Sequence, residues 1–327
     1  MGSKSANTLP IFSSNSPVGN QRYNPRKNSM TKSVQTVPMK RRVRRDKKRA
    51  GVRIAKRRRS SMKTKLAIHG ACGRMGQRLV ALAHADPAFH LVAAIDSPKN
   101  PQIGRDAGEL AGIGNIGLPV VGELPLNIQP DSIIDFSAPA GTMVMLKTCI
   151  DRKIPLVVAT TGFEHAEKAE IEAAMHHTAI LFSPNMSLVV NVLFQLTKLA
   201  GEALAGKGFD VEIVERHHRH KKDSPSGTAA QFAKIVQSAM GQKNIRHGRE
   251  GLVGERPLDE IGVHAVRAGD NVGEHTIIFS TMGETLELVH KGYSRDSYAQ
   301  GALAGAKFLA GKPAGAYTMA DVLGLNR

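Results

Sequence analysis

A glycine-rich turn between an apolar strand and a helix constrains the fold of this chain more than any other segment. Gly70, Gly73 and Gly76 lie in the run Gly-Ala-Cys-Gly-Arg-Met-Gly, which follows apolar residues 66–68 and opens a helical pattern over 74–84. Glycine permits a tight turn at 70, a close approach of the backbone to a pyrophosphate at 73, and close packing of helix on strand at 76. The spacing departs from the commoner G-x-G-x-x-G, so a plain tight turn remains an alternative.

Short apolar runs alternate with helical patterns after this turn. We expect strands at 91–95, 132–136, 155–159 and 179–182, with helices at 141–151 and 164–176 between them. Strands that alternate with crossover helices form a parallel sheet covered on both faces. The sequence therefore predicts an α/β fold with a Rossmann-like dinucleotide-binding domain over 62–186, which residues 292–327, helical at 297–309, complete.

The pattern changes over residues 187–291. Helices are expected at 188–204 and 228–240, a strand at 210–215, and three more strands at 262–267, 274–280 and 285–290. The spacing of the last three suggests an antiparallel meander. We therefore expect a second α+β domain with a mixed or antiparallel sheet.

The net charge of +17 comes from the first 61 residues. They contain 18 of the 45 Lys and Arg but only one of the 28 acids, which leaves 27 residues of each sign in 62–327. A balanced body carries no electrostatic footprint for nucleic acid. The leader is rich in Ser, Asn, Pro, Lys and Arg, so we expect disorder. It is either an RNA-binding or targeting arm or an extension upstream of a natural start at Met62.

Cysteine content and hydropathy bear on the compartment. Cys72 and Cys149 are the only cysteines, and no apolar stretch reaches the length of about 18 residues that predicts a membrane span. Two cysteines cannot build a disulfide framework. We expect a cytoplasmic protein with no membrane partner, and nucleic acid as a partner only through the leader.

Asp96 stands 20 residues beyond Gly76, where the second strand is expected to end. A carboxylate there can accept hydrogen bonds from the adenosine ribose of NAD, or it can simply cap the turn at Ser97. No arginine follows Asp96, and Ser97 and Lys99 lack the forked geometry that holds a 2′-phosphate. We therefore expect NADH to bind at least as well as NADPH.

Two further turns follow expected strands, at residues 159–162 and 183–186. Ligands of open α/β sheets bind beyond the carboxyl ends of the strands. Both turns are therefore candidates to line the nicotinamide side of the cofactor site. Each is equally consistent with an ordinary connection from strand to helix.

A basic cluster at residues 216–222 holds three histidines and four cations. Such a cluster repels itself unless an anion neutralises it, and the following run, Asp-Ser-Pro-Ser-Gly-Thr, opens a helix whose free N–H groups can hold a carboxylate. Two neighbouring anion sites indicate a small dianionic substrate. A histidine and a lysine there can supply the proton that reduction of a C=N bond requires. The alternatives are a solvated basic loop and a metal site, which the cations disfavour.

With these segments in hand, residues 63–327 resemble the 4-hydroxy-tetrahydrodipicolinate reductase (dihydrodipicolinate reductase) family. The resemblance rests on the glycine turn, on Ala-Thr-Thr-Gly-Phe at 159–163, on Ser-Pro-Asn-Met-Ser at 183–187, and on Val-Arg-Ala-Gly-Asp at 266–270 with Gly-Glu-His-Thr at 273–276. It rests most on His-His-Arg-His-Lys at 217–221 followed by Ser-Gly-Thr at 226–228.

The resemblance implies NADH- or NADPH-dependent reduction of 4-hydroxy-tetrahydrodipicolinate, with loss of water, to tetrahydrodipicolinate in lysine biosynthesis. It implies His217 as proton donor or acceptor and Lys221 as proton donor, with His218, Gly227 and Thr228 binding the substrate carboxylates. It also implies a homotetramer that associates through the sheet of the substrate-binding second domain. Cofactor contacts would fall at Gly70, Ala71, Cys72, Gly73, Arg74, Met75, Asp96, Ala159, Thr160, Thr161, Ser183, Pro184, Asn185 and Met186.

Three departures from the family pattern stand out. Ser97 occupies a position where some members have Arg, Ala159 one where Gly is common, and the leader has no counterpart. Other dehydrogenases of the same fold, of the homoserine or aspartate-semialdehyde type, remain alternatives. The second domain lacks the candidate nucleophilic cysteine that the latter type requires. An RNA- or partner-binding protein that uses the leader is a further alternative.

Overall fold

The structure is a computed structural model that describes residues 63–326, so the expected disordered leader lies outside the described residues. Seven parallel strands form the first sheet in the order β12-β6-β5-β4-β1-β2-β3. The chain order thus reverses beside β1, as in a doubly wound sheet. The strands are β1 (Thr64–His69), β2 (Phe89–Ile95), β3 (Val120–Val121), β4 (Ser132–Asp135), β5 (Leu156–Val158), β6 (Ala179–Phe182) and β12 (Gly315–Tyr317).

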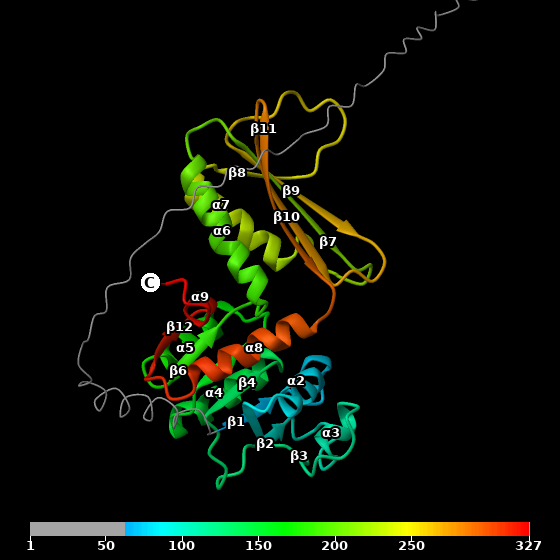
Figure 1. Ribbon diagram of the computed structural model, residues 1–327, viewed down its shortest axis with the longest axis vertical. Coiled ribbons are helices and arrows are strands. Elements are labelled where there is room, and N and C mark those ends of the chain that lie inside the picture. The colour runs from blue at the N-terminus through cyan, green and yellow to red at the C-terminus, as the bar shows by residue number, and fades with distance from the viewer. Residues whose placement is uncertain (1–62, 327) are drawn as a thin grey trace, which may run out of the picture. The chain divides into compact units, whose positions relative to one another are not determined.

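Helices cover both faces of this sheet, as the sequence predicts (Figure 1). Side chains alternate along a strand, so Leu66 and Ile68 of β1 join one core cluster while Ala67 joins the other. The first cluster includes side chains of α2 (Arg74–Ala85), α3 (Ala107–Leu110), α8 (Asp296–Leu309) and α9 (Met319–Leu323), and the second includes side chains of α4 (Pro139–Arg152) and α5 (His165–Ala174).

The second sheet is mixed, with the strand order β11-β10-β7-β9-β8. The expected antiparallel meander is wrong in one respect, because β7 lies between β9 and β10 and pairs in parallel with β9. Spacing along the sequence gives the succession of strands but not their partners. The strands are β7 (Asp210–His217), β8 (Asn244–His247), β9 (Glu260–Arg267), β10 (Gly273–Thr281) and β11 (Glu284–Gly292).

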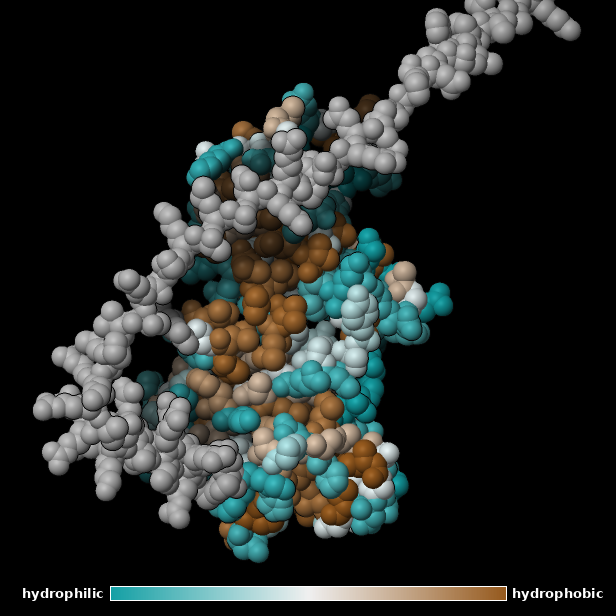
Figure 2. Space-filling model, viewed as in Figure 1, coloured by the Kyte–Doolittle hydropathy of each residue, from teal (hydrophilic) through white to brown (hydrophobic). Residues whose placement is uncertain are grey.

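Two helices, α6 (Leu188–Leu204) and α7 (Gly227–Met240), pack on one face of the second sheet around the buried ring of Phe232. Val189, Leu196 and Leu199 of α6 remain exposed, and Figure 2 shows apolar surface along this helix. The opposite face of the sheet carries the partly exposed Val266 and Val289. Within residues 63–326, no helix is both long and apolar enough to cross a membrane.

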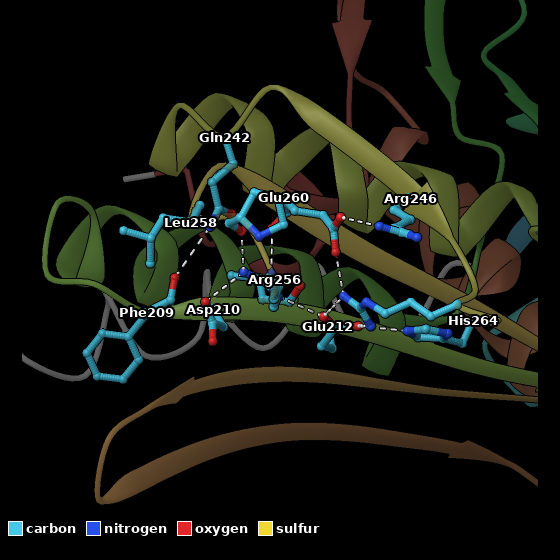
Figure 3. Close-up of polar contacts among 12 residues, drawn as sticks. Phe209, Asp210, Glu212, Gln242, Arg246, Arg256, Leu258, Glu260 and His264 are labelled. Carbon is cyan, nitrogen blue, oxygen red and sulfur yellow. Dashed lines mark hydrogen bonds and ion pairs between the residues drawn. The ribbon is translucent and has the colours of Figure 1, made fainter. Parts of the chain in front are cut away.

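Charged side chains fix the loop after β8 to that opposite face. Glu212 of β7 accepts hydrogen bonds from Arg249 Nη2 at 2.7 Å and from Arg256 Nε at 3.0 Å. Figure 3 shows Arg256 among the acidic side chains of β7 and β9. Although burial raises it, these donors and His264 hold the pKa of Glu212 at about 2. A Cβ on Gly262 would lie 1.8 Å from Glu212 Oε2, so the carboxylate crosses the strand over this glycine and would have to shift for any larger residue.

Candidate active site

The glycine turn has the geometry of a phosphate cradle. Gly70 has φ +80°, and a Cβ there would lie 2.6 Å from the carbonyl oxygen of Phe136. A Cβ on Gly76 would lie 2.1 Å from the carbonyl oxygen of Gly70, so α2 begins in direct contact with the turn. Among residues 63–326, no side chain caps α2 at Gly73, which leaves the first-turn N–H groups available to an anion. The residues present therefore fit the pyrophosphate of a dinucleotide.

The Asp96 carboxylate closes this turn and keeps capacity for a ribose hydroxyl. Its Oδ1 accepts from the Ser97 N–H at 2.8 Å and from Asn100 Nδ2 at 2.9 Å, while Oδ2 accepts from the Cys72 N–H at 2.9 Å. Each carboxylate oxygen accepts about two hydrogen bonds, so Oδ2 retains one lone pair. The turn-capping and cofactor-binding interpretations of Asp96 are thus compatible.

A pocket of about 300 Å³ lies beyond the strand ends of the first sheet. It collects residues from the glycine turn and from both later turns that the sequence singled out. Phe136, Arg295 and Tyr298 also line it, and no sequence motif had pointed to these three. The lining comprises Arg74, Met75, Phe136, Ala159, Thr161, Pro184, Asn185, Met186, Arg295 and Tyr298.

Thr160 and Ser183, two of the expected cofactor contacts, turn their side chains into the protein. The Thr160 hydroxyl donates to Asp135 Oδ2 at 3.3 Å and accepts from the Ser137 N–H at 3.0 Å. The Ser183 hydroxyl donates to the Asn185 carbonyl oxygen at 2.8 Å. Both side chains are buried, so only the backbone of these residues is available to a ligand.

One hydrogen bond joins the cofactor-side turn to the start of α7. Asn185 Nδ2 donates to Thr228 Oγ1 at 2.9 Å, and Asn185 Oδ1 accepts from the Ser187 N–H at 2.9 Å. Thr228 lies in the first turn of α7, directly after Gly227 and the capping residue Ser226. The structure thus brings together two segments that the sequence assigned separately to cofactor and to substrate.

His217, at the end of β7, is held by a buried carboxylate. His217 Nδ1 lies 2.6 Å from Glu215 Oε2. Arg267 forks onto the same carboxylate with two hydrogen bonds of 2.8 Å, and the Ser226 N–H adds a third at 2.9 Å. Burial raises the pKa of Glu215, but these partners outweigh that effect and lower the pKa to about 2. An ionised Glu215 fixes the proton of a neutral His217 on Nδ1 and leaves Nε2 as the acceptor.

Glycine and histidine line the other side of His217. A Cβ on Gly273 would lie 2.9 Å from His217 Nε2, so any side chain there would crowd this nitrogen. The His275 ring lies 5.3 Å from that of His217, and the His290 ring 5.8 Å from that of His275. Burial first, and then the charge of His217, lower the pKa of His275 to about 3. His275 is therefore a neutral residue beside His217.

The rest of the basic cluster is shaped by the loop that joins β9 to β10. The N–H groups of His218 and Arg219 donate to the carbonyl oxygens of Asn271 and Gly269 at 2.8 and 3.1 Å. Burial lowers the pKa of His218, and the cation of Arg295 lowers it further. Lys221 Nζ lies 2.8 Å from Asp223 Oδ1. Within residues 63–326, no three His, Cys, Asp or Glu side chains form a group that could hold a metal ion.

Sequence comparisons agree with this architecture. Residues 64–186 match the family described as "Dihydrodipicolinate reductase, N-terminus", and residues 189–323 match "Dihydrodipicolinate reductase, C-terminus". The chain belongs to the dihydrodipicolinate reductase family. Together the two matches take in the glycine turn, both later turns and the whole basic cluster.

Individual relatives match over their full length. A 4-hydroxy-tetrahydrodipicolinate reductase of Methylococcus capsulatus is 45% identical over 270 residues, covering 81% of this chain and 100% of the relative. One of Burkholderia thailandensis is 44% identical over 271 residues, covering 82% and 100%. A dipicolinate-bound dihydrodipicolinate reductase structure from Paenisporosarcina sp. TG-14 has a TM-score of 0.64 at 24% identity, covering 79% of this chain and 98% of that one, and supports the fold.

Proposed function

We propose that this chain is a 4-hydroxy-tetrahydrodipicolinate reductase, which reduces its cyclic dicarboxylate substrate with NADH or NADPH and releases water. The observation that carries this proposal is the buried Glu215–His217 pair next to the N-terminus of α7, in the same basic cluster as Lys221. Relatives at 44–45% identity carry that name. The dehydrogenases proposed as alternatives from sequence would not require this cluster.

The cofactor would be held by the glycine turn, by the free lone pair of Asp96, and by the pocket between the later turns. When bound, the nicotinamide supplies the hydride. The pocket residues Met75, Phe136 and Met186 exclude water from the reacting face, which strengthens the electrostatic interactions within the site.

The substrate carboxylates would lie against the α7 N-terminus and the neighbouring cations. The free N–H groups of Gly227 and Thr228 favour one carboxylate, and His218 with the cation of Arg295 favours the second. Lys221 donates a proton to the substrate. His217 accepts a proton on Nε2 and can give it back, and Glu215 stabilises the imidazolium that forms in between. Asp223 forms an ion pair with the Lys221 ammonium, and the substrate dianion would displace this carboxylate when it binds.

The chain's partners are proposed to be further copies of itself, in a cytoplasmic homotetramer. The face of the second sheet opposite α6 and α7 is not covered by any helix among residues 63–326, and it carries the exposed side chains of Val266 and Val289. Light scattering of the purified protein tests this assembly, and a monomeric mass at micromolar concentration would contradict it.

The function is tested by following cofactor oxidation with freshly prepared substrate, with NADH and NADPH side by side. His217→Asn and Lys221→Met should each lower kcat by roughly 100-fold or more, the usual contribution of a proton-transfer group. Neither residue lines the cofactor pocket, so the Kd for NADH should stay within about twofold of wild type. Near-normal turnover in both variants would refute the assignment.

A further inference from the structure

The loop after Asp96 returns an arginine to the carboxyl end of β2. Arg105 stands nine residues beyond Asp96, yet its carbonyl oxygen accepts from the Val120 N–H at 2.9 Å on the neighbouring strand β3. The next residue of β3, Val121, accepts from the Asp96 N–H at 3.0 Å. Val120 and Val121 point their backbone groups to opposite sides of β3, so Asp96 and Arg105 flank this short strand at the edge where the adenosine ribose would bind.

A chain of side-chain contacts extends this link to the guanidinium group. Asn100 Nδ2 donates to Asp96 Oδ1 at 2.9 Å, and Asn100 Oδ1 accepts from the Gln102 N–H at 3.0 Å. Gln102 Oε1 in turn accepts from Arg105 Nη1 at 2.6 Å. Burial raises the pKa of the Cys72 thiol to about 11, and the charge of Arg105 opposes this rise, so the guanidinium also lies within electrostatic reach of the glycine turn.

Arg105 has an exposed side chain and an unneutralised charge. None of the carboxylates in residues 63–326 lies within ion-pairing distance of its guanidinium. The exposed Lys99 and Ser97 lie on the same loop. A carboxylate alone at this position favours ribose hydroxyls and repels a phosphate. A planar guanidinium linked to it through Asn100 and Gln102 offers the forked donor that a phosphate prefers.

We propose that Arg105 binds the 2′-phosphate of NADPH, so that this chain binds NADPH at least as tightly as NADH. The inference rests on the proposed nicotinamide cofactor and adds a residue that determines its phosphorylation state. It revises the expectation drawn from the residues that follow Asp96. Residues 97–104 separate Asp96 from the arginine in sequence, and the backbone hydrogen bonds of both residues to β3 return the arginine to the same edge of the sheet.

The test measures cofactor binding without substrate. Full-length protein is titrated with NADPH and with NADH while the nicotinamide fluorescence is followed. Arg105→Ala should weaken NADPH binding about tenfold or more, as expected for a lost charged hydrogen bond, and leave the Kd for NADH within about twofold. Arg105→Lys should fall between Arg105→Ala and wild type, because lysine keeps the charge without the fork.

Lys147→Ala is the matched control, because Lys147 is an exposed cation on α4, which packs on the other face of the sheet from α2. It should change neither Kd. Unchanged NADPH binding by Arg105→Ala, an equal loss for both cofactors, or a wild-type preference for NADH of tenfold or more would each overturn the proposal. Wild-type protein that bound neither cofactor would refute the proposed cofactor itself, which is a distinguishable result.

Discussion

Single residues at this site act through the partners that fix their protons. Glu215 combines full burial with four donor contacts, from His217, Ser226 and the fork of Arg267. A buried carboxylate with fewer donors would carry an uncompensated charge. Its position two residues before His217 on the same strand places both side chains on one face of the sheet. This placement indicates that Glu215 is a positioning residue that acts through His217.

Replacing Glu215 by Gln should lower kcat by about tenfold or more and change its pH profile, because an amide cannot stabilise the imidazolium of His217. The NADH Kd should not change. Glu274→Gln, which removes the half-buried ion-pair partner of Arg216 on the same sheet, is the control and should leave the profile as in wild type. An unchanged pH profile in Glu215→Gln would show that Glu215 does not act through His217.

Folding stability should depend on pH through the same carboxylate. The pKa of Glu215 is about 2 in the folded protein, below its usual value of 4.5, so the unfolded chain binds this proton more readily. The stabilisation is present above pH 4.5 and is lost as the pH falls towards 2.

His275 should make the protein acid-sensitive in a higher window. The pKa of His275 is about 3 in the folded protein, below its usual value of 6.5. Below pH 6.5 the unfolded chain therefore binds a proton on this residue that the folded protein does not bind. Stability should fall by about 1 kcal/mol for each pH unit between 6 and 4. His275→Leu should reduce the difference in Tm between pH 7 and pH 5. An identical difference in variant and wild type would assign the acid sensitivity to other groups.

At the scale of elements, two glycines decide how helices meet strand ends. A Cβ on Gly76 would lie 2.1 Å from the Gly70 carbonyl oxygen, and one on Gly301 would lie 1.7 Å from the Met186 carbonyl oxygen. Gly76 thus seats α2 on the phosphate-binding turn, and Gly301 seats α8 on the turn at 183–186. Backbone atoms cannot move aside as the end of a flexible side chain does.

Gly76→Ala should lower the free energy of unfolding by about 1–3 kcal/mol, the usual cost of overpacking, and weaken NADH binding because the turn is displaced. Chemical denaturation and cofactor titration measure the two effects. Gly227→Ala is the control for stability, since nothing lies within 4 Å of a Cβ there. Equal stability of Gly76→Ala and wild type would mean that α2 can shift without cost.

At the scale of the whole molecule, the reductase body and the leader should be separable. The relatives match 81–82% of this chain over their own full length, and residues 62–327 hold equal numbers of acidic and basic residues. A chain of residues 62–327 should therefore keep the kcat of the full protein within about twofold, whereas any retention on nucleic acid should vanish. Loss of turnover in the shortened chain would give the leader a part in folding or catalysis.

Sequence patterns predicted most of the fold. Apolar residues recur with different periods in strands and helices, and the long elements contain enough repeats for the period to be recognised. They were silent on α3, β3, β8, β12 and α9, which have two to five residues each and are too short to show a period. They also gave the wrong neighbour for β9, since pairing partners are chosen by packing in three dimensions.

The candidate site divides in the same way. The glycine turn, Asp96 and the cluster from His217 to Thr228 could be predicted as candidates, because the residues of each motif lie close together in sequence. Tertiary structure alone decided that Arg267 holds the Glu215 carboxylate beside His217, that Arg295 lines the pocket, and that Thr160 points inward. Arg105 shows the reason most directly. It stands nine residues beyond Asp96 along the chain, yet both residues are hydrogen-bonded to the short strand β3 from its two sides, and strand pairing is not written in local sequence.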